Sequence, residues 1–129
     1  MTGKQSIEGF HKSRSMFCIL KGEIYLAPEN STLSHNEWFE TLGWDAEKTI
    51  QENIRGFADD RGLFFYKGED FHTDENTEKT FFHYLKYIQK ALNLPDENQV
   101  YGGVTPTPNT GYPPKKKYGT IKQIKTLIN

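Results

Sequence analysis

The sequence feature that most constrains the fold of this 129-residue chain is a hairpin near its middle. Two runs rich in β-forming residues, 54–58 and 63–67, flank the turn Asp-Asp-Arg-Gly at residues 59–62, with glycine in the last position. Residues 63–66 read Leu-Phe-Phe-Tyr without a polar break, a pattern typical of a strand that is covered on both faces. We therefore expect a sheet in which this strand is buried.

Further strand regions lie on either side of this hairpin in the sequence. Residues 16–20 and 23–27 are short β-rich runs separated by Lys21-Gly22, which predicts a second hairpin. Residues 99–104 predict a later strand, and the Gly102-Gly103 pair inside it indicates a bulge or a close backbone approach. Because tight turns join antiparallel strands, the sheet is expected to be mainly antiparallel.

Two helices are expected between these strands. Ser34 and Glu37 fit the capping box at the start of a short helix. The main helix is predicted over 77–92, with Asn76 as its cap. One side of this helix carries an apolar stripe and the other a largely basic one, so the helix is amphipathic. The apolar stripe is Phe81, Leu85, Ile88 and Leu92, and the basic side holds Lys79, His83, Lys86 and Lys90.

The two ends of the chain have different compositions. Residues 1–15 are polar and predict a flexible tail. Residues 105–118 contain four prolines and a glycine, which predicts an extended, polyproline-like loop instead of a helix or a central strand. Residues 119–129 have apolar side chains at helical spacing and predict a short amphipathic terminal helix, with a terminal strand as the alternative.

These elements predict a single α+β domain over residues 1–129 with its core at 16–104. The expected order is ββ-α-ββ-α-β, followed by the proline-rich loop and the terminal element. We expect the helices to pack on one face of the sheet.

Composition narrows the class of protein. Apolar residues make up 35% of the chain, which is low, but aromatic residues make up 14%, and each of these can bury a large area. No apolar run approaches the ~20 residues of a membrane span, and the first residues lack the apolar stretch of a signal peptide. Cys18 is the single cysteine, which excludes an internal disulfide framework. We expect a cytoplasmic protein with no membrane partner and no cofactor.

The net charge of −1 conceals a strong segregation of charge along the chain. Residues 28–100 carry seven basic and fifteen acidic side chains, a balance of −8, whereas residues 101–129 carry five lysines and no carboxylate, a balance of +5. The carboxylates fit helix starts and turns, where they have structural roles. The basic segment is therefore where an anionic ligand is expected. The alternative is that it folds back on the acidic middle of its own chain.

A ligand site is predicted where this basic segment crosses the sheet. Lysines would supply charge for a phosphate, tyrosine rings would stack on a base, and glycines would let backbone N–H groups approach closely. Arg55 would add a bidentate contact, and His35 a polar contact near a helix start, with an exposed first-turn histidine as the alternative. The predicted ligand-binding residues are His35, Arg55, Tyr101, Gly102, Gly103, Tyr112, Lys115, Lys116, Lys117 and Tyr118.

No catalytic residue is predicted. The sequence has no G-x-S-x-G, P-loop or G-x-G-x-x-G pattern, and Cys18 lies in an apolar run where a thiol is usually inert. Asp70, His72 and Asp74 would share one side of an extended segment, a spacing that suits a divalent ion. The favoured alternative is an acidic loop before a helix N-terminus, so no metal site is predicted and a metal-dependent hydrolase is the third hypothesis.

The first hypothesis is a small non-enzymatic protein that binds a phosphorylated ligand such as a nucleotide. The second is a protein-interaction module or inhibitor of the phage or mobile-element type that binds a host protein, and a homo-oligomer formed through the C-terminal element fits this hypothesis too. Nucleic acid is a weaker candidate because the middle of the chain is acidic. Convergence of residues 115–117 and 102–103 on a concave site with Arg55 or His35 would favour the ligand, whereas lysines that point apart would favour interaction.

Overall fold

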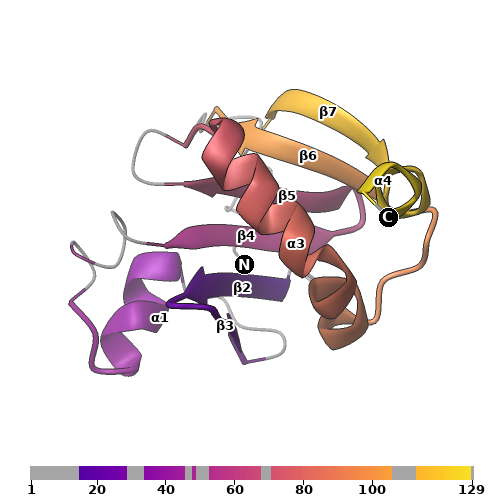
Figure 1. Cartoon of the computed structure of the whole chain (residues 1–129). Helices are drawn as coiled ribbons and strands as arrows, with labels where there is room; N and C mark the ends of the chain where they lie inside the picture. Colours follow the sequence, from indigo (N-terminus) through magenta and orange to yellow (C-terminus); the bar gives the residue numbers. More distant parts are fainter. Residues whose placement is uncertain are drawn as a thin grey trace, which may run out of the picture.

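The structure is a computed structural model that describes residues 15–28, 34–45, 48, 53–67, 71–105 and 113–128. These residues form a mostly antiparallel sheet and helices, so the α+β class is confirmed (Figure 1). In chain order the elements are β2 (Ser15–Leu20), β3 (Glu23–Leu26), α1 (His35–Thr41), β4 (Ile54–Asp59), β5 (Gly62–Lys67), α3 (Glu75–Leu92), β6 (Gln99–Val104), β7 (Pro114–Thr120) and α4 (Ile121–Ile128).

The strands form one six-stranded sheet in the order β3-β2-β4-β5-β6-β7. Four neighbouring pairs are antiparallel, and β5 and β6 are parallel. A tight turn cannot join parallel neighbours, and here α3 forms the crossover between the two strands. Figure 1 shows α3 crossing one face of the sheet, with α4 beside the end of β7.

Both predicted hairpins are confirmed. β4 pairs with β5 from Ile54↔Lys67 to Asp59↔Gly62, and β2 pairs with β3 over the whole of the shorter strand. In the β2–β3 turn, Lys21 and Gly22 have φ angles of 52° and 79°. Two-residue hairpin turns need this left-handed backbone because it matches the twist of the strands.

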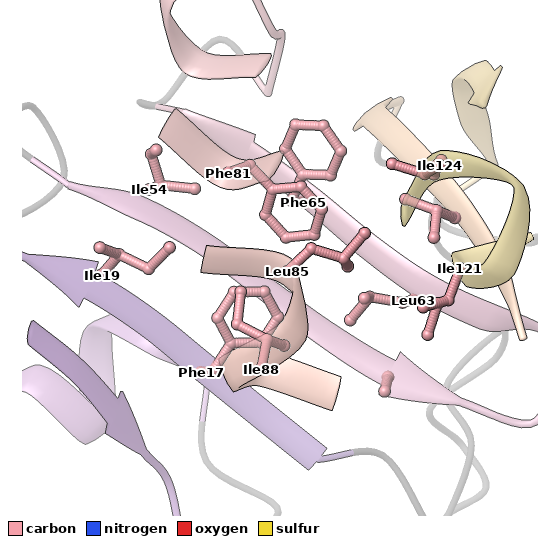
Figure 2. Close-up of a cluster of buried hydrophobic side chains, with 12 residues drawn as sticks. Phe17, Ile19, Ile54, Leu63, Phe65, Phe81, Leu85, Ile88, Ile121 and Ile124 are labelled. Atoms are coloured by element: carbon pink, nitrogen blue, oxygen red, sulfur yellow. The ribbon is translucent and has the colours of Figure 1, made fainter. Parts of the chain in front are cut away.

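Two buried clusters lie on opposite faces of the sheet. Side chains alternate along a strand, and in β5 Leu63 and Phe65 belong to one cluster while Phe64 and Tyr66 belong to the other. The prediction that this strand is covered on both faces is therefore confirmed. Figure 2 shows the first cluster, in which Phe65 lies against Phe81 of α3.

The expectation that all helices pack on one face is wrong. α3 and α4 cover the first cluster, to which they contribute Leu85 and Ile121, whereas α1 covers the second with Trp38 and Phe39. The physical reason lies in β5 itself. Because its side chains are apolar on both sides, a one-sided arrangement would leave a row of rings such as Phe64 in water.

The start of α1 is as predicted, but the start of α3 is not. Ser34 and Glu37 form the capping box, each side chain accepting a hydrogen bond from the other residue's backbone N–H. The cap of α3 is Asp74 instead of Asn76, and the Asp74 carboxylate accepts from the backbone N–H of Thr77 at 2.7 Å. The helix therefore begins two residues earlier than expected, because Asp and Asn are both good caps and sequence spacing does not choose between them.

Residues 105–118 do not form one loop. Residues 114–118 belong to β7, which pairs with β6 from Val104↔Pro114 to Gln99↔Thr120, so the polyproline-like loop is wrong for this part. β7 lies at the edge of the sheet, where a proline in the first position is tolerated and lysines discourage pairing with other chains. Residues 121–128 form helix α4, which decides against the alternative of a terminal strand. Residues 1–14 and 106–112 lie outside the described residues.

Candidate functional site

Seven of the ten predicted ligand-binding residues lie together on the β6–β7 pair. Lys116 is opposite Gly102 and Lys117 is opposite Tyr101 in the register. However, consecutive side chains of a strand point to opposite faces, so the three adjacent lysines cannot present one patch. The remaining members on these strands are Gly103, Lys115 and Tyr118.

Lys116 is held by an ion pair within the chain. Its Nζ lies 2.9 Å from Oε2 of Glu78 on α3, and the Tyr118 hydroxyl donates a hydrogen bond to the same oxygen. Burial alone would raise the pKa of Glu78, but the hydrogen bonds from Tyr118 and Lys116 together lower it. Burial, and then the Glu78 carboxylate, raise the pKa of Tyr118, so the hydroxyl keeps its proton. For Lys116, the folding of the basic segment onto the acidic middle is the arrangement observed.

The glycine pair in β6 has a structural explanation. A Cβ on Gly102 would lie 2.4 Å from a ring carbon of Tyr118, so the absence of a side chain makes room for this ring. Gly103 has φ of 72°, a backbone conformation that favours glycine. The expected close approach is therefore present, and at Gly102 it is made by Tyr118.

Arg55 and His35 lie apart from the lysines, beneath α1. Arg55 is 4% exposed, donates to Oδ1 of Asn36 at 3.0 Å and has its guanidinium 5.0 Å from the ring centre of Phe39. Burial is the main cause that lowers the pKa of Arg55. In the sheet order, β5 and β6 separate its strand from β7. Arg55 therefore attaches α1 to the sheet and does not converge with the lysines.

His35 is 7% exposed, so neither the ligand contact nor the exposed first-turn histidine describes its surroundings. Its Nε2 lies 3.1 Å from the carbonyl oxygen of Gly56 and 3.3 Å from that of Phe17. Both are acceptors, which assigns the proton to Nε2. Nδ1 lies 3.4 Å from the Tyr66 hydroxyl, which can donate to it. His35 therefore joins α1 to the backbone of β2 and β4.

The remaining candidates have structural roles or lie outside the described residues. Tyr112 and Asp70 lie outside the described residues. Asp74 caps α3, and within the described ranges no three His, Cys, Asp or Glu side chains gather as metal ligands would. Burial raises the pKa of Cys18 to about 12, against the smaller opposing effects of Arg55 and the Asn53 amide, so the buried thiol stays protonated.

The structure shows a basic groove between α3 and α4 that the sequence interpretation missed. It has a volume of about 410 Å³, and the described residues that line it include four basic or imidazole side chains and no carboxylate. The signal in the sequence was the basic side of 77–92, to which no ligand-binding role was assigned. The lining residues are Lys79, Phe82, His83, Lys86, Tyr87, Lys125 and Ile128.

The cations of this groove are not equally available. Lys125 donates to Gln89 at 3.0 Å and to the Asp96 carboxylate at 3.1 Å, and Lys79 lies 3.4 Å from Glu75 in an exposed i,i+4 pair. Lys86 lies over the ring of Tyr87, with Nζ 5.2 Å from the ring centre, and forms no ion pair within the described part of the chain. Lys86 is therefore the cation that is freest to meet a partner.

Apolar side chains are exposed in the same place. Tyr87 is 51% exposed and Ile128 is 48% exposed, and both line the groove. Leu127, next to Ile128 on α4, is 82% exposed. Two of the five large exposed hydrophobic side chains among the described residues thus line this groove. Such a gathering of apolar and basic groups is typical of an interaction surface.

Comparisons with protein-family models, with curated proteins and with solved structures give no match for this chain. No helix formed by the described residues is long and apolar enough to cross a membrane.

Proposed function

We propose that this chain is a protein-interaction module and that the groove between α3 and α4 binds an acidic, partly apolar segment of another protein. The observation that carries this proposal is the coincidence of basic and exposed apolar side chains at one concave surface. The metal-dependent hydrolase remains a hypothesis, with Asp74 of its three residues already serving as a helix cap.

Charge selects the partner. The basic or imidazole side chains that line the groove are Lys79, His83, Lys86 and Lys125, so an approaching basic segment would be repelled and an acidic one attracted. Exposed ion pairs are individually weak, which means that charge supplies steering and specificity. Affinity would come from burying the apolar side chains that now face water.

The exposed apolar groups favour a peptide segment over a small phosphorylated ligand. A nucleotide would use the lysines and the ring of Tyr87, but it would leave the exposed side chain of Ile128 in the groove unexplained. Of the lysines at 115–117, Lys116 faces Glu78 on α3 and its two neighbours face the other side of β7, which favours the groove over the site predicted from the sequence. The phosphorylated-ligand hypothesis remains a prediction that the same experiment tests.

The experiment is a titration of isotope-labelled protein followed by the backbone amide signals of α3 and α4. The probes are synthetic peptides of about ten residues, long enough to follow the ~10 Å between Lys79 and Lys86 along the helix. One series combines Asp and Glu with Leu and Phe, and a matched series replaces each acidic residue with Lys. A third arm titrates mono- and dinucleotides. We expect the acidic series alone to shift the signals around Lys86 and Lys125.

The variant Lys86→Glu should weaken binding of the acidic series on the order of tenfold, which corresponds to about 1.4 kcal/mol. Lys117→Glu is the matched control, since Lys117 is an exposed lysine on β7, away from the groove. Equal weakening by the two variants would mean unspecific charge attraction. Signals of α3 and α4 that respond to nucleotides and not to acidic peptides would overturn the proposal in favour of the ligand hypothesis.

A further inference from the structure

The two borders of the sheet differ in how well they resist pairing with another strand. β7 forms one border and β3 the other, and Figure 1 shows them at opposite sides of the sheet. β7 begins with Pro114 and continues with lysines, and both features discourage pairing at an edge. β3 reads Glu-Ile-Tyr-Leu over residues 23–26 and has a single charged side chain, Glu23. β3 is therefore the border of the described sheet that is open to a further strand.

The backbone of β3 offers hydrogen-bonding groups on its outer side. The two-residue turn makes Glu23 a hydrogen-bonded partner of β2, and such pairs alternate along an antiparallel hairpin. Ala27 fits the alternation, because its N–H donates to the carbonyl oxygen of Met16 at 3.0 Å. Ile24 and Leu26 lie at the alternate positions and therefore direct their N–H and C=O groups away from β2. No strand among the described residues pairs with this outer side.

The apolar clusters on both faces of the sheet reach this border. Ile24 packs against the first cluster, and Tyr25 and Ala27 pack against the second, all three being only partly buried. Because alternate residues of a strand share a face, Leu26 lies on the same face as Ile24. The Leu26 side chain is 44% exposed. A further strand at this border would bury it and extend both clusters.

A second copy of the same strand fits this border in an antiparallel register. With a two-fold axis beside Tyr25, Ile24 of each copy lies opposite Leu26 of the other. These residues point their N–H and C=O groups outward, so each pair exchanges two hydrogen bonds. An axis perpendicular to the sheet preserves its faces, so Ile24 and Leu26 meet on one face and the two Tyr25 rings meet on the other. The strand is thus complementary to itself, as an isologous interface requires.

Charge also favours a second copy. In this register Glu23 lies opposite Ala27, so the two Glu23 carboxylates are about 13 Å apart along the strands, more than the screening length of about 8 Å at physiological salt. The whole chain has a net charge of −1, so two copies do not repel one another strongly. Pairing of β3 with the other border of a second copy would meet Pro114, which has no N–H, and the lysines that follow it.

We propose that β3 is the docking edge for a second copy of this chain, and that the two β3 strands pair antiparallel to make one continuous sheet across a two-fold dimer. Standard interfaces use ~20–30 residues a side and β3 offers four, so the dimer is weak and depends on concentration. None of the described residues that line the groove between α3 and α4 belongs to β3. The dimer is therefore independent of the proposed groove function.

The test is sedimentation velocity of the full chain from about 10 µM to about 1 mM, a range that brackets a weak dimer. We expect the sedimentation coefficient to rise with concentration from the value of a monomer to that of a dimer. Leu26→Lys should weaken the dimer by about tenfold or more, because it places a charge against the apolar Ile24 of the second copy. Leu42→Lys is the matched control and should leave the Kd unchanged, since Leu42 is also 44% exposed but ends α1.

Ile24→Pro separates strand pairing from a contact between side chains alone. The Ile24 N–H points outward, so proline removes no hydrogen bond between β3 and β2 but blocks the pair with Leu26 of the second copy. Ile24→Lys serves if proline disturbs the hairpin. We expect these variants to stay monomeric. In the wild type, hydrogen exchange at the Ile24 and Leu26 amides should slow as the concentration rises.

Three results would overturn the proposal. A wild type that stays monomeric over the whole range would leave this edge to an extended segment of another protein. Species larger than a dimer would mean head-to-tail assembly. A dimer that survives Leu26→Lys and the Ile24 variants would lie on another surface.

Discussion

Replacing Glu78 by glutamine tests whether the basic segment is held by its own chain. Glu78 lies on α3, with its side chain 20% exposed, and accepts hydrogen bonds from Lys116 and Tyr118 of β7. Glu78→Gln removes the charge and keeps the shape. We expect the edge strand to lose part of its attachment to α3 and the protein to lose stability.

The magnitude follows from the two partners. Lys116 has a 56% exposed side chain, so its ion pair contributes about 0.2–1 kcal/mol at most. The Tyr118 hydroxyl is partly buried, and a hydrogen bond to a charged acceptor contributes about 1.5–3 kcal/mol. Glutamine retains one acceptor, so a net loss of about 1–2 kcal/mol is expected. For a chain of this length that is a fall of about 4–8 °C in melting temperature.

The assay is urea unfolding of the wild type and Glu78→Gln across pH. The folded-state pKa of Glu78 is lowered, so its contribution is complete above the unfolded value of about 4.3 and is lost as pH falls through the folded value. The difference in unfolding free energy between the two proteins should therefore be largest near neutral pH and should disappear in acid. Tyr118→Phe should destabilise more than Lys116→Met. Equal stability at neutral pH, or a difference that persists in acid, would refute the reasoning.

Two further predictions concern the scaffold, and both are measured by urea unfolding. Gly56→Ala should destabilise the protein by about 3 kcal/mol or more, because the new Cβ would lie 2.3 Å from a ring carbon of Phe17 in the core. The control is Gly43→Ala, where the new Cβ has open space and only the strain of a φ of 80° remains. This variant should cost about 1 kcal/mol. A similar loss in both variants would contradict the packing of the core. Asp74→Ala should lower stability and Asn76→Ala should not, since Asp74 is the cap of α3. A loss of stability in Asn76→Ala and none in Asp74→Ala would mean that Asn76 is the cap, as the sequence predicts.

The parts of the fold that follow from local rules could be predicted from sequence. The two hairpins depend on turn residues between β-rich runs, and the capping box at Ser34 depends on a spacing of three residues. The sequence also predicted that the sheet is covered on both faces, since residues 63–66 are apolar on both sides of the strand. The expectation that all helices pack on one face of the sheet contradicts the apolar run at residues 63–66. A local observation should have overruled the general expectation for antiparallel sheets.

The edge strand could not be predicted because the features of an edge resemble those of a loop. β7 begins with Pro114 and continues with three lysines, a composition that excludes a central strand. An edge strand forms backbone hydrogen bonds with a neighbour, here β6, on one side only. Charged side chains on its free edge are favourable because they discourage pairing with other chains. The partner that decides the matter, Gly102 opposite Lys116, is distant in sequence.

The same reasoning explains why counting charge by segment misplaced the site. The +5 segment is divided by the fold: Lys116 pairs with Glu78, Lys125 bonds to Asp96 at the groove, and Lys117 faces the side of the sheet opposite to Lys116. Meanwhile Lys86, which belongs to the −8 segment, lies beside Lys125 in one concave surface. Because Lys86 forms no ion pair among the described residues while Lys125 does, an acidic partner should engage Lys86 directly and compete with Asp96 for Lys125. Replacing Asp96 should therefore strengthen, and replacing Lys86 should weaken, whatever acidic segment the groove binds.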